Sequence, residues 1–263
     1  MTENIDIGKL VTGKEKLYFL ILAIANLLFF ALVGLLFTTA ALNPQVAKIL
    51  PVLVFYFITL SSIIIFSQGI FIGGIKNHGV KVTENQMPGV LKSAEKLSAQ
   101  MGLKKIPEIY IIESGGLLNA FATKFFLGSK SFVVLYSDIL DLAFNKGEGA
   151  IEFVIAHELA HIKRNHIDKR YLLMPMILFI PFINQAYYRA CEYTCDKIAT
   201  ALVGQEAARQ GLSVLCLGKK LFGNLNINDM IQSARDNGGF WTWLSEKLAT
   251  HPAMYKRLEK VQG

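Results

Sequence analysis

The sequence predicts an α+β fold: a mostly helical domain with a small sheet, preceded by a hairpin of two transmembrane helices. Three observations carry this prediction. Two long uncharged runs lie near the N-terminus, later segments show helical and strand patterns in turn, and hydrophobic residues make up 52% of the chain against 18% charged residues. A soluble domain carries roughly 25% charged residues, so this apolar surplus indicates more than one globular core. The composition also excludes disordered, coiled-coil and disulfide-stapled classes.

The beginning of the chain predicts the membrane hairpin. Residues 1–16 form a short polar segment, and two runs of 31 and 27 residues without a charge follow it. Each run exceeds the ~20 apolar residues that a helix needs to cross a bilayer. Because Asn43-Pro44 is a turn signal, we expect the spans near residues 17–42 and 50–74. A cleavable signal peptide fits poorly, since the first run is too long and a second run follows at once.

Basic residues around the spans predict their orientation. Three precede the first span, one lies between the spans and three follow the second: Lys9, Lys14, Lys16, Lys48, Lys76, Lys81 and Lys92. This bias predicts a multi-pass protein of the cell (plasma or inner) membrane whose termini and main domain are cytoplasmic. Three cysteines, an odd and sparse set, fit such a reducing compartment.

The net charge of +7 indicates which partners to expect. The basic residues are scattered, and no run reaches the length of a nucleic-acid-binding arm. We therefore expect a lipid bilayer as a partner and no nucleic acid. The sequence does not indicate an oligomeric state.

Residues 76–263 are long enough for one domain, and their patterns predict its elements. Helices are expected at 87–101, 148–165, 187–203, 205–222, 241–248 and 253–261, and strands at 106–112 and 132–136. Residues 171–188 are uncharged, but prolines interrupt them and only 172–183 are truly apolar. This stretch is too short to cross a bilayer, so we expect it to contact the membrane, with a buried core helix as the alternative.

The strongest chemical signal is His157-Glu158-Leu159-Ala160-His161. Residues four apart share one face of a helix, so His157 and His161 can bind one zinc ion while Glu158 acts as the general base. The alternative is a helix with two solvated or core-paired histidines. Chance would produce this motif in such a chain on the order of 0.005 times, which favours the metal site.

A third ligand is expected about 30 residues later. Glu192 and Asp196 are again four apart on a predicted helix. Glu192 suits the zinc ion itself, whereas Asp196 suits the outer N–H of a ligating histidine, where it would fix the tautomer. An unrelated pair of surface acids is the alternative.

Together these motifs resemble the gluzincin clan, and within it the HtpX-like integral-membrane zinc metallopeptidases, relatives of the CAAX prenyl endopeptidases. Two spans precede the domain, Thr250-His251-Pro252 is similar to a closing motif of the family, and a segment similar to its NAFA motif is made of Asn119, Ala120, Phe121 and Ala122. The resemblance implies a gluzincin catalytic domain with one zinc ion per chain. One feature departs from it: larger members often carry two further spans between the zinc helix and the third ligand.

The resemblance also implies roles for substrate-binding residues. It makes residues 132–136 the edge strand that pairs with substrate backbone, so Val133 and Val134 become binding residues beside residues 119–122. An internal strand is the alternative for 132–136. His251 would donate an N–H to the oxyanion of the reaction, or else cap and pack a helix. His166 is expected to be solvated, five residues after His161 and off the ligand face.

The function that follows is a membrane zinc endopeptidase that hydrolyses peptide bonds of membrane or membrane-associated proteins, with quality control as the role we expect for it. A scaffold with a structural zinc site is one alternative, but it would have no need of Glu158. A processing protease for lipidated proteins is another, although two or three spans are few for an enclosed chamber.

Overall fold

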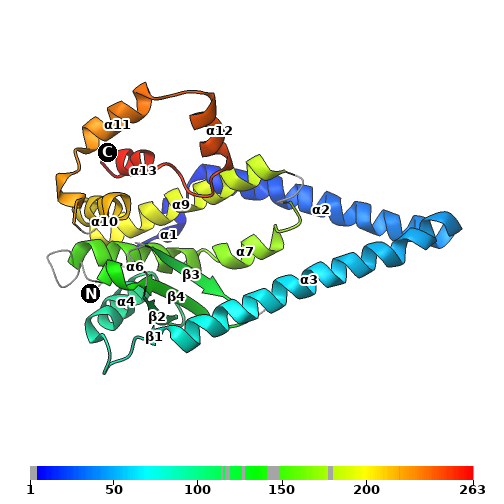
Figure 1. The fold of residues 1–263 in the computed structure, drawn as a ribbon, viewed down its shortest axis with the longest axis horizontal. Coiled ribbons are helices and arrows are strands. Elements are labelled where there is room, and N and C mark those ends of the chain that lie inside the picture. The colour runs from blue at the N-terminus through cyan, green and yellow to red at the C-terminus, as the bar shows by residue number, and fades with distance from the viewer. Residues whose placement is uncertain are drawn as a thin grey trace.

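The computed structural model describes residues 5–113, 115, 119–125, 128–140, 148–176, 180–218 and 220–262. Two long helices, α2 (Gly13–Leu42) and α3 (Pro44–His78), project together from one side of a domain that holds all the other elements (Figure 1). The predicted fold class is confirmed: the domain is mostly helical, contains one four-stranded sheet and follows two helices suited to a membrane.

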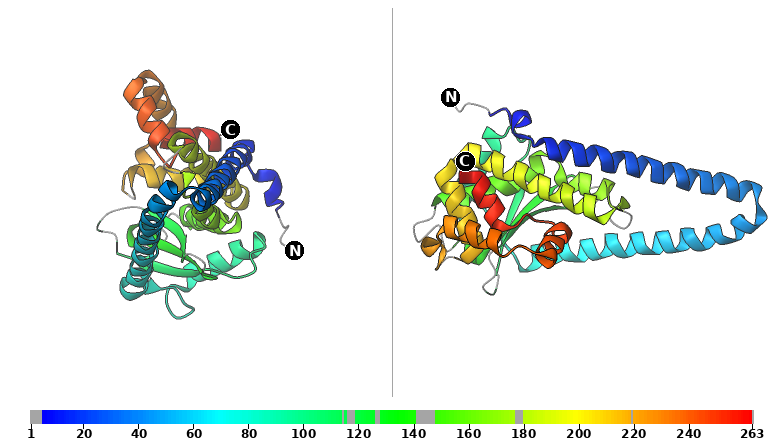
Figure 2. Two further views of the ribbon diagram at one scale, coloured as in Figure 1. Left: turned by 90° about the vertical axis from the view of Figure 1, so that its right-hand side faces the viewer. Right: turned by 90° about the horizontal axis from the view of Figure 1, so that it is seen from above.

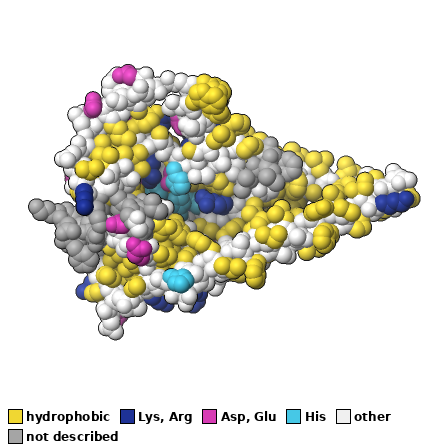
Figure 3. Space-filling view, viewed as in Figure 1, with side chains coloured by type: hydrophobic (Ala, Val, Ile, Leu, Met, Phe, Trp, Pro, Cys, Tyr) yellow, Lys and Arg dark blue, Asp and Glu magenta, His cyan; other side chains and the backbone are white. Residues whose placement is uncertain are grey.

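The hairpin helices have the length and apolar surface of membrane spans. Their most apolar windows have mean hydropathies of 2.8 and 2.5, and only 11% of the first window and none of the second is buried in protein. They are therefore unlike the core helices of a soluble domain, and hydrophobic side chains recur along the visible face of the hairpin (Figure 3). Asn43 alone joins them: its N–H donates to Thr39 and its side chain accepts from the N–H of Gln45. The second helix therefore begins at Pro44, earlier than expected.

The sheet has the strand order β1-β2-β4-β3. Its strands are β1 (Val80–Lys81), β2 (Glu108–Ile112), β3 (Ala120–Lys124) and β4 (Ser131–Tyr136). Strand β4 pairs in parallel with β2 on one side and antiparallel with β3 on the other. The expectation that 132–136 form an edge strand is therefore wrong. That strand is internal because it is apolar on both faces, with Val133 and Val134 fully buried. The two edges of the sheet are β1 and β3, and the sequence pattern predicted neither strand.

The helices of the domain largely follow the predicted pattern. They are α1 (Ile7–Leu10), α4 (Pro88–Gln100), α6 (Glu148–Lys163), α7 (His166–Leu172), α9 (Pro181–Val203), α10 (Gln205–Leu217), η1 (Phe222–Asn224), α11 (Ile227–Asp236), α12 (Phe240–Leu248) and α13 (Met254–Gln262). Helices α1, α7 and α11 were not predicted, although Ile227, Met230 and Ile231 give α11 the spacing of an amphipathic helix. Helix α9 begins earlier than expected, at Pro181, where proline is favoured in the first turn.

Helix α6 lies at the centre of the core and carries the predicted zinc motif. Phe153, Ile155 and Leu159 are fully buried against the neighbouring helices α4, α9 and α10. Helix α10 approaches closely at Gly211, where a Cβ atom would lie 2.6 Å from the ring of Phe153. The zinc helix is thus fixed by close packing, and its polar residues need no flexible loop to hold them.

The first membrane helix packs directly onto the domain. Leu22 of α2 is fully buried in a cluster with Leu173 and Tyr187, and the Asn26 side chain donates to the Leu172 carbonyl at 3.0 Å. Just before α2, the N–H of Thr12 donates to the Thr194 hydroxyl at 3.2 Å. The described residues before α2 therefore lie against the domain (Figure 2). The expected membrane-contacting stretch lies beside this helix, except that 177–179 fall outside the described residues.

Candidate metal centre

Helix α6 places the two motif histidines on one face, as their spacing predicts. Their Nε2 atoms lie 3.2 Å apart, and His157 is 6% exposed. Glu158 is 8% exposed and lines the same small cleft as His157. A helix buried on several sides leaves one polar face, and here that face carries both imidazoles and a carboxylate.

Glu192 of α9 completes a three-residue group. Its two oxygens lie 3.3 Å from Nε2 of His157 and 3.3 Å from Nε2 of His161. Burial would raise the pKa of Glu192, but hydrogen bonds from both histidines lower it well below its usual range. Ligands held at about 2.0–2.1 Å around a tetrahedral zinc ion lie about 3.3–3.4 Å from one another. The donor set and its spacing therefore fit zinc, with one coordination position left open.

The outer nitrogen of His157 has the partner expected from the sequence. Nδ1 of His157 lies 3.0 Å from Oδ1 of Asp196, and Arg257 of α13 donates to both oxygens of that carboxylate at 2.8 and 2.7 Å. Burial alone would raise the pKa of Asp196, but the guanidinium of Arg257 lowers it. Asp196 is thus held ionised, which keeps the proton on Nδ1 and leaves Nε2 free for a metal.

The outer nitrogen of His161 also has a buried partner. Nδ1 of His161 lies 3.1 Å from Nδ1 of His166, whose Nε2 lies 3.2 Å from a carboxylate oxygen of Glu15 in α2. The expectation that His166 is solvated is therefore wrong: it is 6% exposed, because the chain turns at Asn165 and starts α7 against the zinc helix. Burial lowers the pKa of His166 to about 4, so the ring is neutral and can accept at Nδ1 while donating from Nε2.

Two neighbouring groups also bring potential metal ligands together. One contains Glu15, His166 and Cys191, and the other contains His161, His166 and Cys195. Burial raises the pKa of both thiols, so neither is a thiolate at neutral pH. Two cations already lie beside the carboxylate of Glu15: Arg164 at 2.9 Å and Lys169 at 3.9 Å. Among the groups that the described residues form, the one made of His157, His161 and Glu192 is therefore suited to zinc.

The small cleft beside this group opens between α6, α9, β3 and the segment after α12. Its lining residues are Asn119, Ala120, Phe153, Val154, His157, Glu158, Glu192, Leu215, His251 and Arg257. His251 lies at the mouth, 65% exposed by its side chain, with Nε2 3.8 Å from Oε1 of Glu192. Its Nδ1 lies 2.9 Å from the hydroxyl of Thr250. Histidine side chains are visible in the middle of the domain on the face drawn in Figure 3.

The side chains of the predicted substrate-binding residues lie on different faces of the sheet. Asn119 and Ala120 line the cleft, and Ala122 lies on the same side of β3 as Ala120 because strand residues alternate. Phe121 points to the opposite side, where its ring contacts those of Phe71 and Tyr136. Val133 and Val134 pair with Ala122 and Phe121 inside the sheet. Backbone pairing with a substrate is therefore possible at β3 and excluded at the internal strand.

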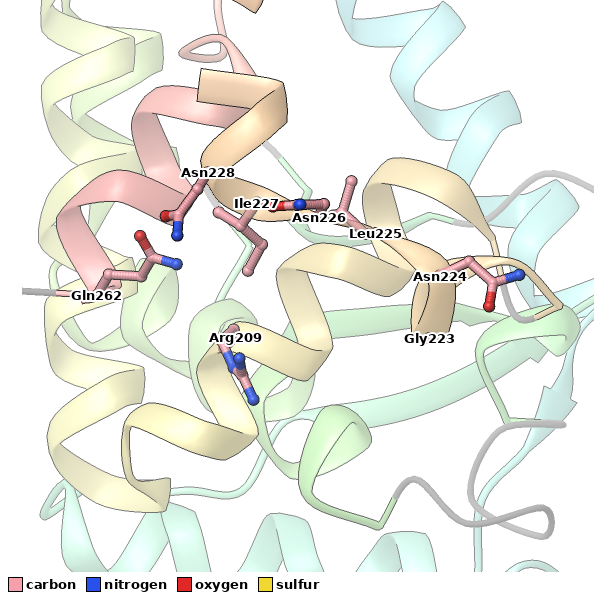
Figure 4. Close-up of a pocket in the computed structure, with 8 residues that line it drawn as sticks. All are labelled: Arg209, Gly223, Asn224, Leu225, Asn226, Ile227, Asn228 and Gln262. Carbon is pink, nitrogen blue, oxygen red and sulfur yellow. The ribbon is translucent and has the colours of Figure 1, made fainter. Parts of the chain in front are cut away.

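A second hollow lies among α10, η1, α11 and α13. Figure 4 shows its lining: Arg209, Gly223, Asn224, Leu225, Asn226, Ile227, Asn228 and Gln262. None of these described residues is a histidine, cysteine or carboxylate. The hollow therefore offers amide contacts but no metal-binding or acid–base chemistry.

Three residues around the metal group were not identified from the sequence. Arg257 lies on α13, six positions after His251, and this closeness in the chain was its only signal. A sequence does not show that an arginine is buried. Glu15 is an acid between Lys14 and Lys16 at the start of the first span, where a solvated residue is the usual interpretation. His166 was judged on the geometry of one continuous helix, whereas the structure turns before it.

Two histidines from one helix and a carboxylate from another thus come together in a domain attached to two apolar helices. Residues 85–186 match the sequence profile of Peptidase family M48, and residues 140–263 match that of Peptidase U49. The two matches overlap on the zinc helix. They support the resemblance to membrane zinc metallopeptidases that the motifs predict.

The fold is also similar to a solved structure. The crystal structure of S. mikatae Ste24p superposes with a TM-score of 0.52 at 19% sequence identity, and the match covers 95% of this chain. It covers 66% of the Ste24p chain, so about a third of that protein has no counterpart here. No curated protein sequence matches this chain. The structural likeness concerns the fold, and the activity has to be argued from the site.

Proposed function

We propose that this chain is a zinc-dependent endopeptidase that hydrolyses peptide bonds of membrane or membrane-associated proteins on the cytoplasmic side of the membrane. The observation that carries the proposal is the convergence of His157, His161 and Glu192 within 3.2–3.3 Å, with Glu158 in the same cleft. A structural zinc site normally uses four protein ligands. Three ligands and an adjacent carboxylate favour catalysis over a scaffold role.

The residues divide the chemistry among them. A zinc ion bound by the three ligands would polarise the scissile carbonyl and lower the pKa of the attacking water. Glu158 takes a proton from that water and delivers it to the leaving amine. His251, at the mouth of the cleft, donates an N–H to the oxygen on which negative charge develops. Asp196 holds His157 in the orientation and tautomer that a ligand needs.

The outer edge of β3 supports a role in holding an extended substrate, although the carbonyl of Lys124 at its end already accepts from Gln68 and Tyr171. No described strand pairs with its outer edge, and Asn119 and Ala120 bring this edge to the metal residues. An added strand binds through main-chain hydrogen bonds, which tolerate many side chains. Broad tolerance fits quality control of membrane proteins better than processing of one defined sequence. The hairpin places the cleft close to such substrates.

The test compares the wild-type protein with Glu158→Gln in liposomes. The change is nearly isosteric and removes only the base, so we expect zinc content to stay and cleavage to fall by about 100-fold or more. Cleaved peptides are identified by mass spectrometry from a membrane-protein mixture. Glu152→Gln is the matched control, because Glu152 lies on the same helix but pairs with Lys96 at the surface. Undiminished cleavage by folded, zinc-loaded Glu158→Gln protein would refute the proposal.

A further inference from the structure

Helix α12 exposes a cluster of large aromatic side chains. Phe240, Trp241 and Trp243 are 63%, 77% and 50% exposed, and the helix has no buried residue. The ring of Phe240 lies 5.1 Å from that of Trp241 and 6.1 Å from that of Trp243, measured between centroids. The ring of Phe240 thus joins the two tryptophans into one exposed cluster. A contiguous exposed apolar patch of this kind marks a contact with another phase or partner.

Helix α12, which carries this cluster, is held in place at its C-terminal end. Nη1 of Arg189 in α9 lies within hydrogen-bond distance of three carbonyls, those of Glu246 and Lys247 at 2.9 Å and that of Ala249 at 2.7 Å. Lys256 of α13 adds an ion pair to Glu246 at 2.6 Å. Helix ends otherwise leave their last carbonyls without partners, so this arginine acts as a cap shared between two helices. The aromatic face is thus displayed by an anchored helix.

The side of the domain that carries α12 faces the membrane hairpin. The first half of α9 packs on α2, and the bond from Asn26 to the Leu172 carbonyl places residue 172 beside the first span, beyond its start near residue 17. Leu172 and Phe182, both about half exposed, continue the apolar surface at that level. Helix α12 contacts α9 and lies toward the hairpin in both views of the long axis (Figures 1 and 2). Hydrophobic side chains gather there in Figure 3.

We propose that α12 is an interfacial anchor that rests in the phospholipid surface, with Phe240, Trp241 and Trp243 at the level of the headgroups. Tryptophan suits this depth because its ring is apolar and its N–H is polar. A bilayer is the occupant because the patch lies on the side of the domain from which a hairpin suited to lipid projects (Figure 1). The segment leading to His251 begins at Ala249, the residue that Arg189 binds. The anchor therefore also fixes the height of the cleft above the membrane.

The chain itself supplies the probe, since Trp241 and Trp243 are its two tryptophans. The full protein is reconstituted in vesicles of phosphatidylcholine and phosphatidylglycerol, and part of the phosphatidylcholine carries bromine at a shallow or a deep position of the acyl chain. Bromine quenches tryptophan only on close approach. We expect a loss of emission that is larger with shallow than with deep bromine. Emission unchanged by either lipid would overturn the proposal, whether its wavelength indicates water or a protein contact.

Three variants make the test independent of other quenching. In a Trp241→Phe/Trp243→Phe background, Asn228→Trp moves the probe to α11, on the part of the domain away from the hairpin (Figure 1). We expect no quenching there. Single Trp241→Phe and Trp243→Phe variants should each retain quenching of the other ring. Equal quenching at position 228 would mean that the whole domain touches lipid without a specific anchor, and would also refute the assignment. None of these outcomes depends on peptidase activity.

Discussion

Glu15 reaches the metal group from the start of the first membrane helix, and its replacement by glutamine tests whether the hairpin supports the zinc site. The carboxylate is 1% exposed, lies 3.2 Å from Nε2 of His166 and accepts from Arg164 at 2.9 Å. His166 in turn lies 3.1 Å from the outer nitrogen of His161. Glu15→Gln keeps the shape and an acceptor oxygen but removes the charge.

The magnitude follows from the hydrogen bonds that change. A hydrogen bond to a charged group contributes about 1.5–3 kcal/mol and a neutral one about 0.5–1.5 kcal/mol. The difference, about 1–1.5 kcal/mol, corresponds to roughly tenfold weaker zinc binding if it reaches His161 in full. His166→Phe removes the partner of His161 itself. We therefore expect zinc affinity to fall by about 10–100-fold, the range typical when an outer partner of a metal ligand is lost.

The assay is zinc affinity measured by competition with a chelator, on protein whose fold is checked by circular dichroism. If Glu15 acts through His166, the double variant should bind zinc no more weakly than His166→Phe alone, because the two changes break one chain of contacts. Glu206→Gln is the matched control, since Glu206 pairs with Arg209 on an exposed helix surface. Unchanged zinc affinity in folded Glu15→Gln protein, or fully additive losses in the double variant, would refute this reasoning.

The remaining predictions concern the ligands, the mouth of the cleft and the topology. Glu192→Ala should lower zinc affinity more than Asp196→Ala, because one removes a ligand and the other an orienting partner worth about 10–100-fold; equal affinity in wild type and Glu192→Ala would place the third ligand elsewhere. His251→Ala should lower kcat by about 100-fold, the typical worth of an oxyanion donor, with little change in KM or zinc content; full activity would leave it a packing role. In intact cells a single cysteine at Gln45 should react with an impermeant reagent and one at Glu113 should not, and the reverse pattern would overturn the cytoplasmic assignment.

The parts of the fold that could be predicted are those where a local pattern repeats along one element. The two membrane helices could be predicted from their length and hydropathy, and α6 from its apolar residues at helical spacing. Strand β3 was missed because Ala120–Lys124 is short and only half-buried throughout, which gives no alternating pattern. The assignment of 132–136 to the sheet edge failed for a related reason. A sequence shows that a segment is a strand, but its neighbours depend on pairing partners far away in the chain.

The residues of the candidate site also fall into those that helical spacing predicts and those that it does not. His157, Glu158 and His161 are fixed by one helical turn, and Glu192 with Asp196 by another, so spacing alone brought the metal group within reach. Arg257 and Glu15 could not be found in this manner. Each is a charged residue whose ordinary place is the surface. Arg257 is buried in an ion pair with Asp196, and Glu15 is buried in an ion pair with Arg164.

The outer nitrogens of His157 and His161 are each held by a chain of contacts, and these two chains lead to opposite ends of the sequence. His157 is oriented through Asp196 by α13, near the C-terminus, and His161 through His166 by α2, near the N-terminus. Both ends of the chain must therefore be folded onto α6 before its two histidines hold their ligand geometry. The membrane hairpin is one of these ends. A domain cut from its hairpin would lose a buried carboxylate beside the site and the apolar cover of Leu22, so the attachment to the membrane is part of the metal site's construction.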